Sequence, residues 1–529
     1  LDVDRLTSHV FITGSTGAGK SNTIYALLEQ LGQNNVPFLV IEPAKGEYKQ
    51  VFGHRDDVSV FGTNARFSPL LRINPFRFPE TTHVFEHIDR LVDVFSMCWP
   101  MYAAMPAVLK DAILQAYTVC GWDLVTSENH WHPSPLFPTF ADLQEQLRQV
   151  IEQSEWSQEV KSNYIGSLVT RVNSLTNGLN GQIFSGEEID NSLLFDSNTI
   201  IDLSRIGSQE TRSFITGILV IRLSEHRAAM SGMNQALRHV TVLEEAHHLL
   251  KRSGGNAGAE GADITGKAVE MLANAIAEMR TWGEGFIIAD QSPAAVDMAA
   301  IRNTNTKIIM RLPEDMDRRT AGKSAALSDE QLDELARLPR GVAVVYQNDW
   351  LEPVLCRVRK FDAPAEPWQY KPTVALVATS PQAWTLLLSW LLNHRLPQPV
   401  DITPQQLVER IDTLRLSTRN KILLRLLIAE FETHRTLRIQ REDQFRQLAS
   451  TITGLLDCRR ELMHQLSQCS DFSTLNSTLD ILLTRRTGEL PTALRIAVQQ
   501  CLMKDVSGES ETWLKTYAGW RKHVQETLQ

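Results

Sequence analysis

Residues 14–21 fill the pattern G-x-x-x-x-G-K-[ST], which in nucleotide-binding proteins forms a loop around phosphate groups. The apolar residues 10–12 before the loop predict a strand, and residues 22–28 after it predict a helix. The motif requires such flanks, because backbone N–H groups of the loop and the positive end of the helix together attract phosphate. The chain is therefore expected to contain an α/β domain that binds a nucleoside triphosphate.

Individual residues of this loop have expected roles in holding ATP and Mg²⁺. Lys20 is expected to reach the β- and γ-phosphates, and the hydroxyl of Ser21 is expected to coordinate Mg²⁺. The glycines allow backbone N–H groups to turn toward the β-phosphate. The expected nucleotide-binding residues are Gly14, Ser15, Thr16, Gly17, Ala18, Gly19, Lys20, Ser21 and Asn22.

A second segment, residues 321–324, repeats the end of this pattern. Asp317 stands in the place of the first glycine, and no strand-like run precedes it. We therefore interpret residues 321–324 as a loop and not as a second phosphate site.

The overall composition excludes several classes of protein. A length of 529 residues allows two or three domains, each with its own core. The net charge of −9 is not that of a simple nucleic-acid-binding module, so any DNA contact must be local. The six cysteines include no C-x-x-C pair, which argues against a zinc site or a disulfide framework. Since no apolar window reaches the length of a membrane span, we expect a cytoplasmic protein with no membrane partner.

The patterns along the chain divide it into parts. Strand-like and helical patterns alternate at about 10–62 and 199–346, which is typical of a parallel α/β sheet. Between these parts, long amphipathic stretches indicate helices, and a proline-rich linker near 363–367 precedes a helical remainder. We expect an ATPase core in two parts, 1–82 and 181–362, a helical insertion at 83–180, and a C-terminal helical domain at 363–529.

A second nucleotide signature is the apolar run 240–243, which is followed by Glu244 and Glu245. Ligands collect at the carboxyl ends of strands in open α/β sheets. Hydrolysis needs one carboxylate near Mg²⁺ and another that orients and deprotonates the attacking water. We assign Glu244 to Mg²⁺ and Glu245 to the water. A solvated strand end is the alternative, and it is less consistent with a phosphate loop in the same chain.

A third strand-like run, 286–289, ends near Gln291, whose amide can sense the γ-phosphate or hold the catalytic water. A simple turn is the alternative. Charge on the transition state is expected to be compensated by an arginine from a neighbouring subunit. Arg280 and Arg311 are both candidates, and the sequence does not separate them from each other or from surface arginines.

Two further features carry weaker signals. The glycine-rich residues 251–261 predict a mobile loop. In a ring-shaped motor this loop would project into the channel and contact phosphates through Lys251, Arg252 or Lys267; a plain connector is the simpler interpretation. His247 and His248 have no acidic or cysteine partner at zinc spacing, so we expect no metal site there.

Together these segments resemble the HerA/FtsK group of P-loop ATPases, and specifically HerA-like proteins. The resemblance covers roughly residues 8–360, with five motifs in the family's order. The matching segments are 9–23, 41–48, 243–247, 290–293 and 303–311. The resemblance implies a RecA-like P-loop NTPase core, to which the helical insertion and the C-terminal helical domain are added.

The same resemblance implies a function. HerA-like proteins form homohexameric rings that hydrolyse ATP and move duplex DNA through a central pore. The resemblance gives Gln291 the sensor role and gives either Arg280 or Arg311 the finger role. It also implies that Glu42 and Glu47 lie beside the nucleotide.

Two departures from the family pattern bear on this function. The family usually has aspartate at the position of Glu244, so the expected metal ligand is longer by one methylene. We find no counterpart of the family's N-terminal β-barrel, which often contributes to ring assembly and to the docking of a nuclease. HerA-like proteins work in DNA end resection and in antiphage systems, so a partner nuclease or another effector protein is expected.

The sequence leaves more than one function open. The leading hypothesis is a ring-forming DNA translocase. The alternative is an assembly scaffold whose ATP cycle activates a partner effector without moving DNA. A secretion or conjugation motor is less consistent with the lack of an apolar membrane segment. The partner, the direction of translocation and the role of the C-terminal domain are not defined by the sequence.

Overall fold

The computed structural model of the chain contains two compact units, Leu1–Pro372 and Thr373–Gln529, which are described separately below. Among the residues described, no helix has both the length and the apolar character needed to cross a membrane. The structure describes residues 1–102, 104–132, 134–184, 188–230, 232–252, 260–362, 364, 366–370, 381–397, 402–411, 414, 416–466, 469 and 471–528.

The first unit is built around a sheet with the strand order β11-β10-β9-β1-β8-β7-β2-β6-β3. Neighbouring strands from β9 to β3 pair in parallel, whereas β10 pairs antiparallel with both β9 and β11. This is the α/β core expected from the sequence. Strand β11 was not predicted, because its residues are mostly exposed at the sheet edge. The strands are β1 (Val10–Thr13), β2 (Phe38–Glu42), β3 (Val58–Gly62), β6 (Asn198–Asp202), β7 (His239–Leu243), β8 (Glu284–Asp290), β9 (Thr306–Ile309), β10 (Val342–Gln347) and β11 (Val354–Arg357).

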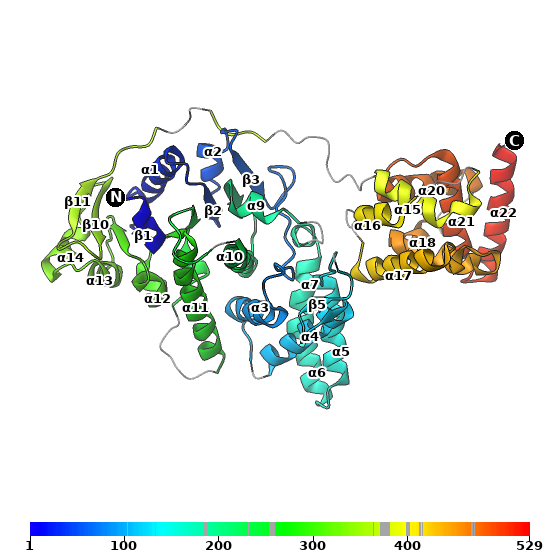
Figure 1. The fold of residues 1–529 in the computed structure, drawn as a ribbon, viewed down its shortest axis with the longest axis horizontal. Helices are drawn as coiled ribbons and strands as arrows, with labels where there is room; N and C mark the ends of the chain where they lie inside the picture. Colours follow the sequence, from blue (N-terminus) through cyan, green and yellow to red (C-terminus); the bar gives the residue numbers. More distant parts are fainter. Residues whose placement is uncertain are drawn as a thin grey trace. The chain divides into compact units, whose positions relative to one another are not determined.

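Helix α1 (Lys20–Gln33) packs on the sheet next to β1 (Figure 1). Its buried residues Ile24, Leu28 and Leu31 join the core cluster that contains Val10 and Ile12 of β1. Because α1 begins immediately after the glycine-rich loop, this packing fixes the loop at the carboxyl edge of the sheet, with the N-terminus of the helix directed toward it.

The other core helices surround the sheet. One of them, α13 (Asp315–Ser324), includes residues that the sequence predicted to be a loop. Residues 321–324 form the last turn of a helix and not a loop. Gly322 packs so closely on the next helix that an added Cβ would lie 2.0 Å from Cδ2 of Leu332, so tertiary packing decides the local structure. The helices are α2 (Tyr48–Phe52), α9 (Asn191–Phe195), α10 (Gln209–Met230), α11 (Glu260–Glu278), α12 (Met298–Arg302), α13 (Asp315–Ser324) and α14 (Asp329–Leu335).

A helical group lies between β3 and β6 in the chain and forms one cluster beside the core (Figure 1). A buried contact ties it to α10, since His87 Nδ1 lies 2.9 Å from Glu225 Oε1. A short strand pair, β4 (Trp122–Asp123) and β5 (Glu128–Asn129), was not predicted. The helices are α3 (Val84–Cys98), α4 (Met105–Val119), α5 (Phe140–Gln153), α6 (Gln158–Tyr164), the π-helix η2 (Ile165–Val169), α7 (Thr170–Thr176) and α8 (Asn180–Ile183).

The second unit consists of helices in its described part, as the sequence predicted. Its core is rich in leucine and includes the buried side chains of Trp390 and Trp520. Gly488, with φ 76°, follows the last residue of α20 (Phe472–Thr487) and ends this helix. The helices are α15 (Pro381–Leu391), α16 (Pro404–Ile411), α17 (Thr418–His434), α18 (Phe445–Leu456), α19 (Arg459–Leu466), α20 (Phe472–Thr487), α21 (Thr492–Val506) and α22 (Glu511–Leu528). The residue boundaries assigned to the four parts of the chain stay predictions.

Candidate nucleotide-binding site

The glycine-rich loop leaves β1 and is held by its neighbours on the sheet. The N–H of Ser15 donates to the carbonyl of Arg311 (2.8 Å), and the N–H of Gly341 donates to the carbonyl of Ala18 (2.9 Å). Gly14 lies so close to the chain after β9 that an added Cβ would be 2.7 Å from Cβ of Met310. A side chain at this position would push the loop away from the sheet, so the first glycine of the motif is a packing requirement.

The loop fits an anionic group. Within the described residues, the N–H groups of Gly17, Gly19, Lys20 and Ser21 have no hydrogen-bond acceptor, and α1 has no side-chain cap. The buried hydroxyl of Ser15 also lacks a partner there. Unpaired N–H groups at a helix N-terminus attract phosphate oxygens. The donor set therefore matches the phosphates of a nucleotide.

Lys20 lies among the acidic residues of the site. Its ammonium group donates to the carbonyl of Gly14 (2.8 Å). Burial lowers the pKa of Lys20, and the negative charges of Glu245, Glu244 and Asp290 oppose that shift. The fold thus brings the lysine of the first motif together with the carboxylates of the second and third motifs, which are more than two hundred residues away in the chain.

Asn22, the last of the predicted nucleotide-binding residues, has its amide engaged elsewhere. Its Nδ2 donates to the carbonyl of Arg359 (2.9 Å), and its Oδ1 accepts the N–H of Phe361 (2.9 Å). This side chain therefore fastens the segment after β11 to α1. A contact of Asn22 with nucleotide stays a prediction.

Glu245 and Gln291 connect three loops at the carboxyl edge. Glu245 follows β7 in the left-handed conformation (φ 48°, ψ 52°), which is uncommon for residues other than glycine. Its Oε1 accepts a hydrogen bond from Gln291 Nε2 (2.5 Å), and Gln291 Oε1 accepts one from the hydroxyl of Thr16 (2.6 Å). The acidic residue assigned to the water is thus linked through Gln291 to the phosphate loop. Strained backbone and such a link are typical of catalytic sites.

Glu244, the other acidic residue after β7, is held by a tyrosine of α2. Its Oε1 accepts a hydrogen bond from the hydroxyl of Tyr48 (2.6 Å). Burial raises the pKa of Glu244, while the hydrogen bond from Tyr48 opposes the shift. The carboxylate and the hydroxyl of Ser21 are oxygen donors of the kind that Mg²⁺ prefers. Both residues therefore suit the metal-binding role predicted for them, which stays a prediction.

Tyr48 is the first residue of α2 and directly follows a loop, residues 43–47, that is fastened to the ends of β2 and β6. Glu42 Oε1 accepts the N–H of Glu47 (2.7 Å), and Glu42 Oε2 accepts the N–H of Tyr48 (3.2 Å). Burial raises the pKa of Glu42 to about 8. Gly46 has φ 69°, and an added Cβ would lie 3.2 Å from the hydroxyl of Ser204. Glu42 therefore shapes this loop, and the contact of Glu42 and Glu47 with nucleotide stays a prediction.

His247 has acidic partners that the sequence spacing did not reveal. Asp290 Oδ2 accepts the backbone N–H of His247 (2.8 Å) and lies 2.9 Å from its Nδ1. This hydrogen bond raises the pKa of His247. Ligand atoms of Glu245, His247 and Asp290 all lie within 4.8 Å of one another. Spacing along the chain did not reveal these partners, because β7 and β8 become neighbours only in the sheet. The expectation of no metal site at His247 and His248 stays a prediction.

The two candidate arginines lie at opposite edges of the sheet. Arg311 follows β9, and its carbonyl accepts the N–H of Ser15, so it is beside the loop of its own chain. Arg280 lies in the short helix η4 (Met279–Trp282) before β8, at the amino edge. Burial lowers the pKa of His9, just ahead of β1, to about 4, and the charge of Arg280 adds to that shift. The finger role of either arginine stays a prediction.

Most of the glycine-rich segment at 251–261 lies outside the described residues, which end at Arg252 and resume at Glu260. The backbone of Lys251 forms an isolated antiparallel β-bridge with that of Val296, and the N–H of Arg252 donates to the carbonyl of Ala295 (2.8 Å). The mobile loop therefore stays a prediction.

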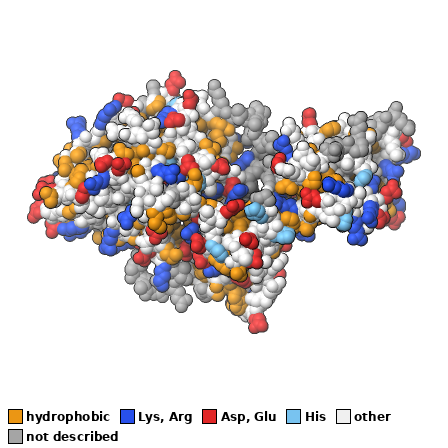
Figure 2. All heavy atoms as spheres, in the orientation of Figure 1, with side chains coloured by type: hydrophobic (Ala, Val, Ile, Leu, Met, Phe, Trp, Pro, Cys, Tyr) orange, Lys and Arg blue, Asp and Glu red, His pale blue; other side chains and the backbone are white. Residues whose placement is uncertain are grey.

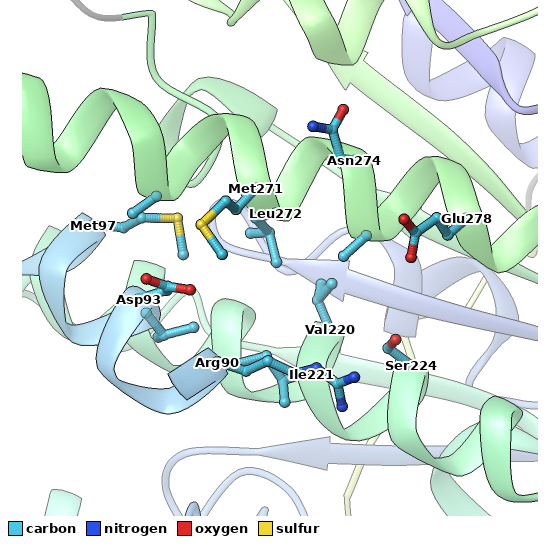
Figure 3. A pocket seen from close by; sticks show the side chains of 13 residues that line it. Arg90, Asp93, Met97, Val220, Ile221, Ser224, Met271, Leu272, Asn274 and Glu278 are labelled. Carbon is cyan, nitrogen blue, oxygen red and sulfur yellow. The ribbon is translucent and has the colours of Figure 1, made fainter. Parts of the chain in front are cut away.

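A cavity of about 290 Å³ lies away from these residues, among α3, α10 and α11 (Figure 3). Met97, Met271 and Leu272 give it an apolar lining, and Asp93 and Glu278 lie at its rim. None of the predicted site residues lines it, and it offers no loop of N–H groups to a phosphate.

Comparison with known proteins gives a family match for the first part of the chain. Residues 1–222 match the family model described as "Helicase HerA, central domain". This part of the chain is therefore similar to the central domain of HerA helicases. The resemblance to HerA-like proteins predicted from the sequence is thereby confirmed for this part of the chain.

Two curated relatives and one solved structure are also similar to this chain. A probable helicase of Methanocaldococcus jannaschii is 23% identical, over 67% of this chain and 66% of the relative. The DNA double-strand break repair helicase HerA of Sulfurisphaera tokodaii is 20% identical, over 68% of this chain and 66% of the relative. The chain thus spans about two thirds of the length of these relatives. VirB4 of Thermoanaerobacter pseudethanolicus superposes with a TM-score of 0.52 at 19% identity, over 69% of this chain and 93% of that chain, which shows that the fold is shared.

Proposed function

We propose that this HerA-like protein is a ring-forming ATPase that couples ATP hydrolysis to the movement of duplex DNA. The observation that carries the ATPase part is the connection from Glu245 through Gln291 to Thr16 of the open phosphate loop. A base for the attacking water, an amide beside it and a phosphate cradle are the parts that hydrolysis of a triphosphate needs.

Each residue has one task in this proposal. The free N–H groups of the loop and the ammonium group of Lys20 bind the phosphates, and Ser21 and Glu244 hold Mg²⁺, which neutralises phosphate charge when bound. Glu245 accepts the proton of the attacking water, and Gln291 orients that water through its amide. An arginine from the next subunit, Arg280 or Arg311, completes the site, which is why a homohexameric ring is part of the proposal.

The DNA part rests on the relatives, one of which is named a DNA double-strand break repair helicase. Figure 2 shows one face of the molecule, on which the lysine and arginine side chains of the described residues are interspersed with aspartate and glutamate. With a net charge of −9, the chain is expected to contact DNA at a local site such as the inside of a ring. A nuclease or another effector protein, in DNA processing or antiphage defence, is the proposed partner.

The proposal is tested by ATPase rates with and without linear duplex DNA. We expect DNA to raise the rate severalfold in the wild type, and Lys20→Ala to abolish hydrolysis under both conditions. An unchanged rate in the presence of DNA, with rings intact by native mass measurement, would instead support an ATP-dependent scaffold that activates a partner without translocation. A stable monomer in the presence of ATP would contradict a site completed by a neighbouring subunit.

A further inference from the structure

We propose that Tyr48 is a positioning residue for Glu244, and that its hydroxyl holds this carboxylate in the geometry that binds the metal ion. The inference rests on the function proposed above, because it concerns the same site. It assigns a task to a residue that does not itself contact nucleotide or water in the proposal.

The contact is short, and the tyrosine that makes it is buried. The hydroxyl of Tyr48 donates to Oε1 of Glu244 at 2.6 Å, and only 1% of the Tyr48 side chain is exposed. Among the described residues, this is the one hydrogen bond that the carboxylate of Glu244 receives. One carboxylate oxygen is therefore fixed, and the other keeps its full capacity to accept.

Tyr48 is itself held from several directions. Its N–H donates to Glu42 Oε2 (3.2 Å), and its ring makes an edge contact with Tyr25 of α1 at a centroid distance of 5.1 Å. The next residue, Lys49, forms a buried ion pair with Asp202 (2.5 Å). Since α1 begins in the phosphate loop, the tyrosine ring connects the helix of the first motif to the acidic residue of the second.

Such a fixed partner matters because glutamate has a long side chain. Several rotamers are open to Glu244, and each must be given up when the carboxylate binds a metal ion. A hydrogen bond from a buried, immobile hydroxyl removes this freedom before the ion arrives. The loss of the hydroxyl is therefore expected to weaken metal binding, while contacts of the phosphates with Lys20 persist.

The test is a Mg²⁺ titration of the thermal stability of the full chain with ADP, for wild type and Tyr48→Phe. Tyr48→Phe keeps the ring and its contact with Tyr25. We expect the Mg²⁺ concentration that gives half of the rise in Tm to increase about tenfold, as for loss of a hydrogen bond to a charged group. The matched control is Tyr25→Phe, which removes a neighbouring hydroxyl that bonds Glu47 and should stay within about twofold of wild type on the same scale.

A second arm asks whether Tyr48 acts through Glu244. In the Glu244→Gln background, Tyr48→Phe should add no further weakening of the Mg²⁺ response. An equal additional weakening in that background, or a Tyr48→Phe response within twofold of wild type, would overturn the inference. Because the readout is binding of Mg²⁺ with ADP, a wild-type chain that does not hydrolyse ATP would refute the proposed function while leaving this test intact. In the active enzyme, Tyr48→Phe should lower kcat at limiting Mg²⁺ and leave the KM for ATP at saturating Mg²⁺ unchanged.

Discussion

The carboxylates at the two edges of the central sheet differ in the number of hydrogen bonds that they accept from the protein. At the amino edge, Glu284 accepts hydrogen bonds from His239 Nδ1 (2.8 Å), Arg227 Nε (2.8 Å) and the hydroxyl of Thr241 (2.7 Å). Burial by itself would favour the neutral acid, but His239 and Arg227 lower the pKa of Glu284 below its ordinary value. Both carboxylate oxygens of Glu284 therefore accept hydrogen bonds from donors inside the protein.

At the carboxyl edge, the balance is the opposite. Glu244 receives one hydrogen bond, from Tyr48, and burial raises its pKa. Glu245 is held by an amide and adopts a left-handed backbone. A buried carboxylate that its own chain neutralises stabilises the fold, whereas one with spare acceptor capacity is available to a ligand. Burial alone therefore does not identify the site; the partners do.

The largest expected effect is the loss of ATP hydrolysis when Glu245 is changed. Glu245→Gln should reduce ATP hydrolysis by at least about 10²-fold, because the amide cannot accept a proton from water, while nucleotide binding persists. Steady-state hydrolysis and equilibrium binding of a fluorescent ATP analogue measure the two effects. Glu159→Gln, at an exposed position on α6, is the control and should hydrolyse ATP at the wild-type rate. Ordinary turnover in Glu245→Gln would remove this residue from its role.

The next effect concerns stability at the two edges. Glu284→Gln removes one of the two carboxylates paired with buried Arg227, leaving Asp196, and should cost about 3 kcal/mol of unfolding free energy. Glu244→Gln keeps an oxygen for the hydroxyl of Tyr48 and should cost less than about 1 kcal/mol. Urea denaturation compares the two variants. Equal losses would mean that the edges do not differ in the way described.

The pH dependence of stability sharpens the comparison at Glu42. Burial raises the pKa of this carboxyl from 4.5 to about 8 in the folded protein. Between these values the unfolded chain has released the proton that the folded chain keeps, so the contribution of Glu42 to the free energy of unfolding decreases as the pH rises through this window. Urea denaturation at pH values near both ends should show a smaller decrease for Glu42→Gln than for wild type. The same decrease in both proteins would assign the pH dependence to other groups.

The smallest effect is expected for Asn22. Its amide bonds the backbone of Arg359 and Phe361, so Asn22→Ala should cost about 1 kcal/mol of stability and leave nucleotide affinity within about twofold of wild type. Denaturation and nucleotide titration provide the two numbers. A tenfold loss of affinity with unchanged stability would show that the side chain leaves these bonds to contact nucleotide.

Local sequence patterns predicted the strands that lead to the candidate site. Strand β1, which leads into the phosphate loop, and strand β7, which ends at Leu243, are both buried. Their positions could be predicted because each contains a run rich in apolar residues. The resemblance to HerA-like proteins supplied the order of the motifs, and the match of residues 1–222 confirmed the resemblance for that part of the chain.

Features that depend on tertiary contacts were not predictable in the same way. The bond from Asp290 to His247 exists because β7 and β8 pair side by side, which spacing along the chain does not show. The hydrogen bond from Tyr48 to Glu244 joins residues that are 196 positions apart. The only available signal was that Tyr48 lies in a segment that matches the family. The helical turn at 321–324 was missed because packing on α14 overrides a local loop pattern.

The most direct test of the central claim is hydrolysis of ATP by the purified wild-type chain in the presence of Mg²⁺, measured beside Lys20→Ala. We predict that the wild type binds and hydrolyses ATP and that the variant does neither. Equal nucleotide binding and equal phosphate release by the two proteins would contradict the assignment of the carboxyl edge as the nucleotide site.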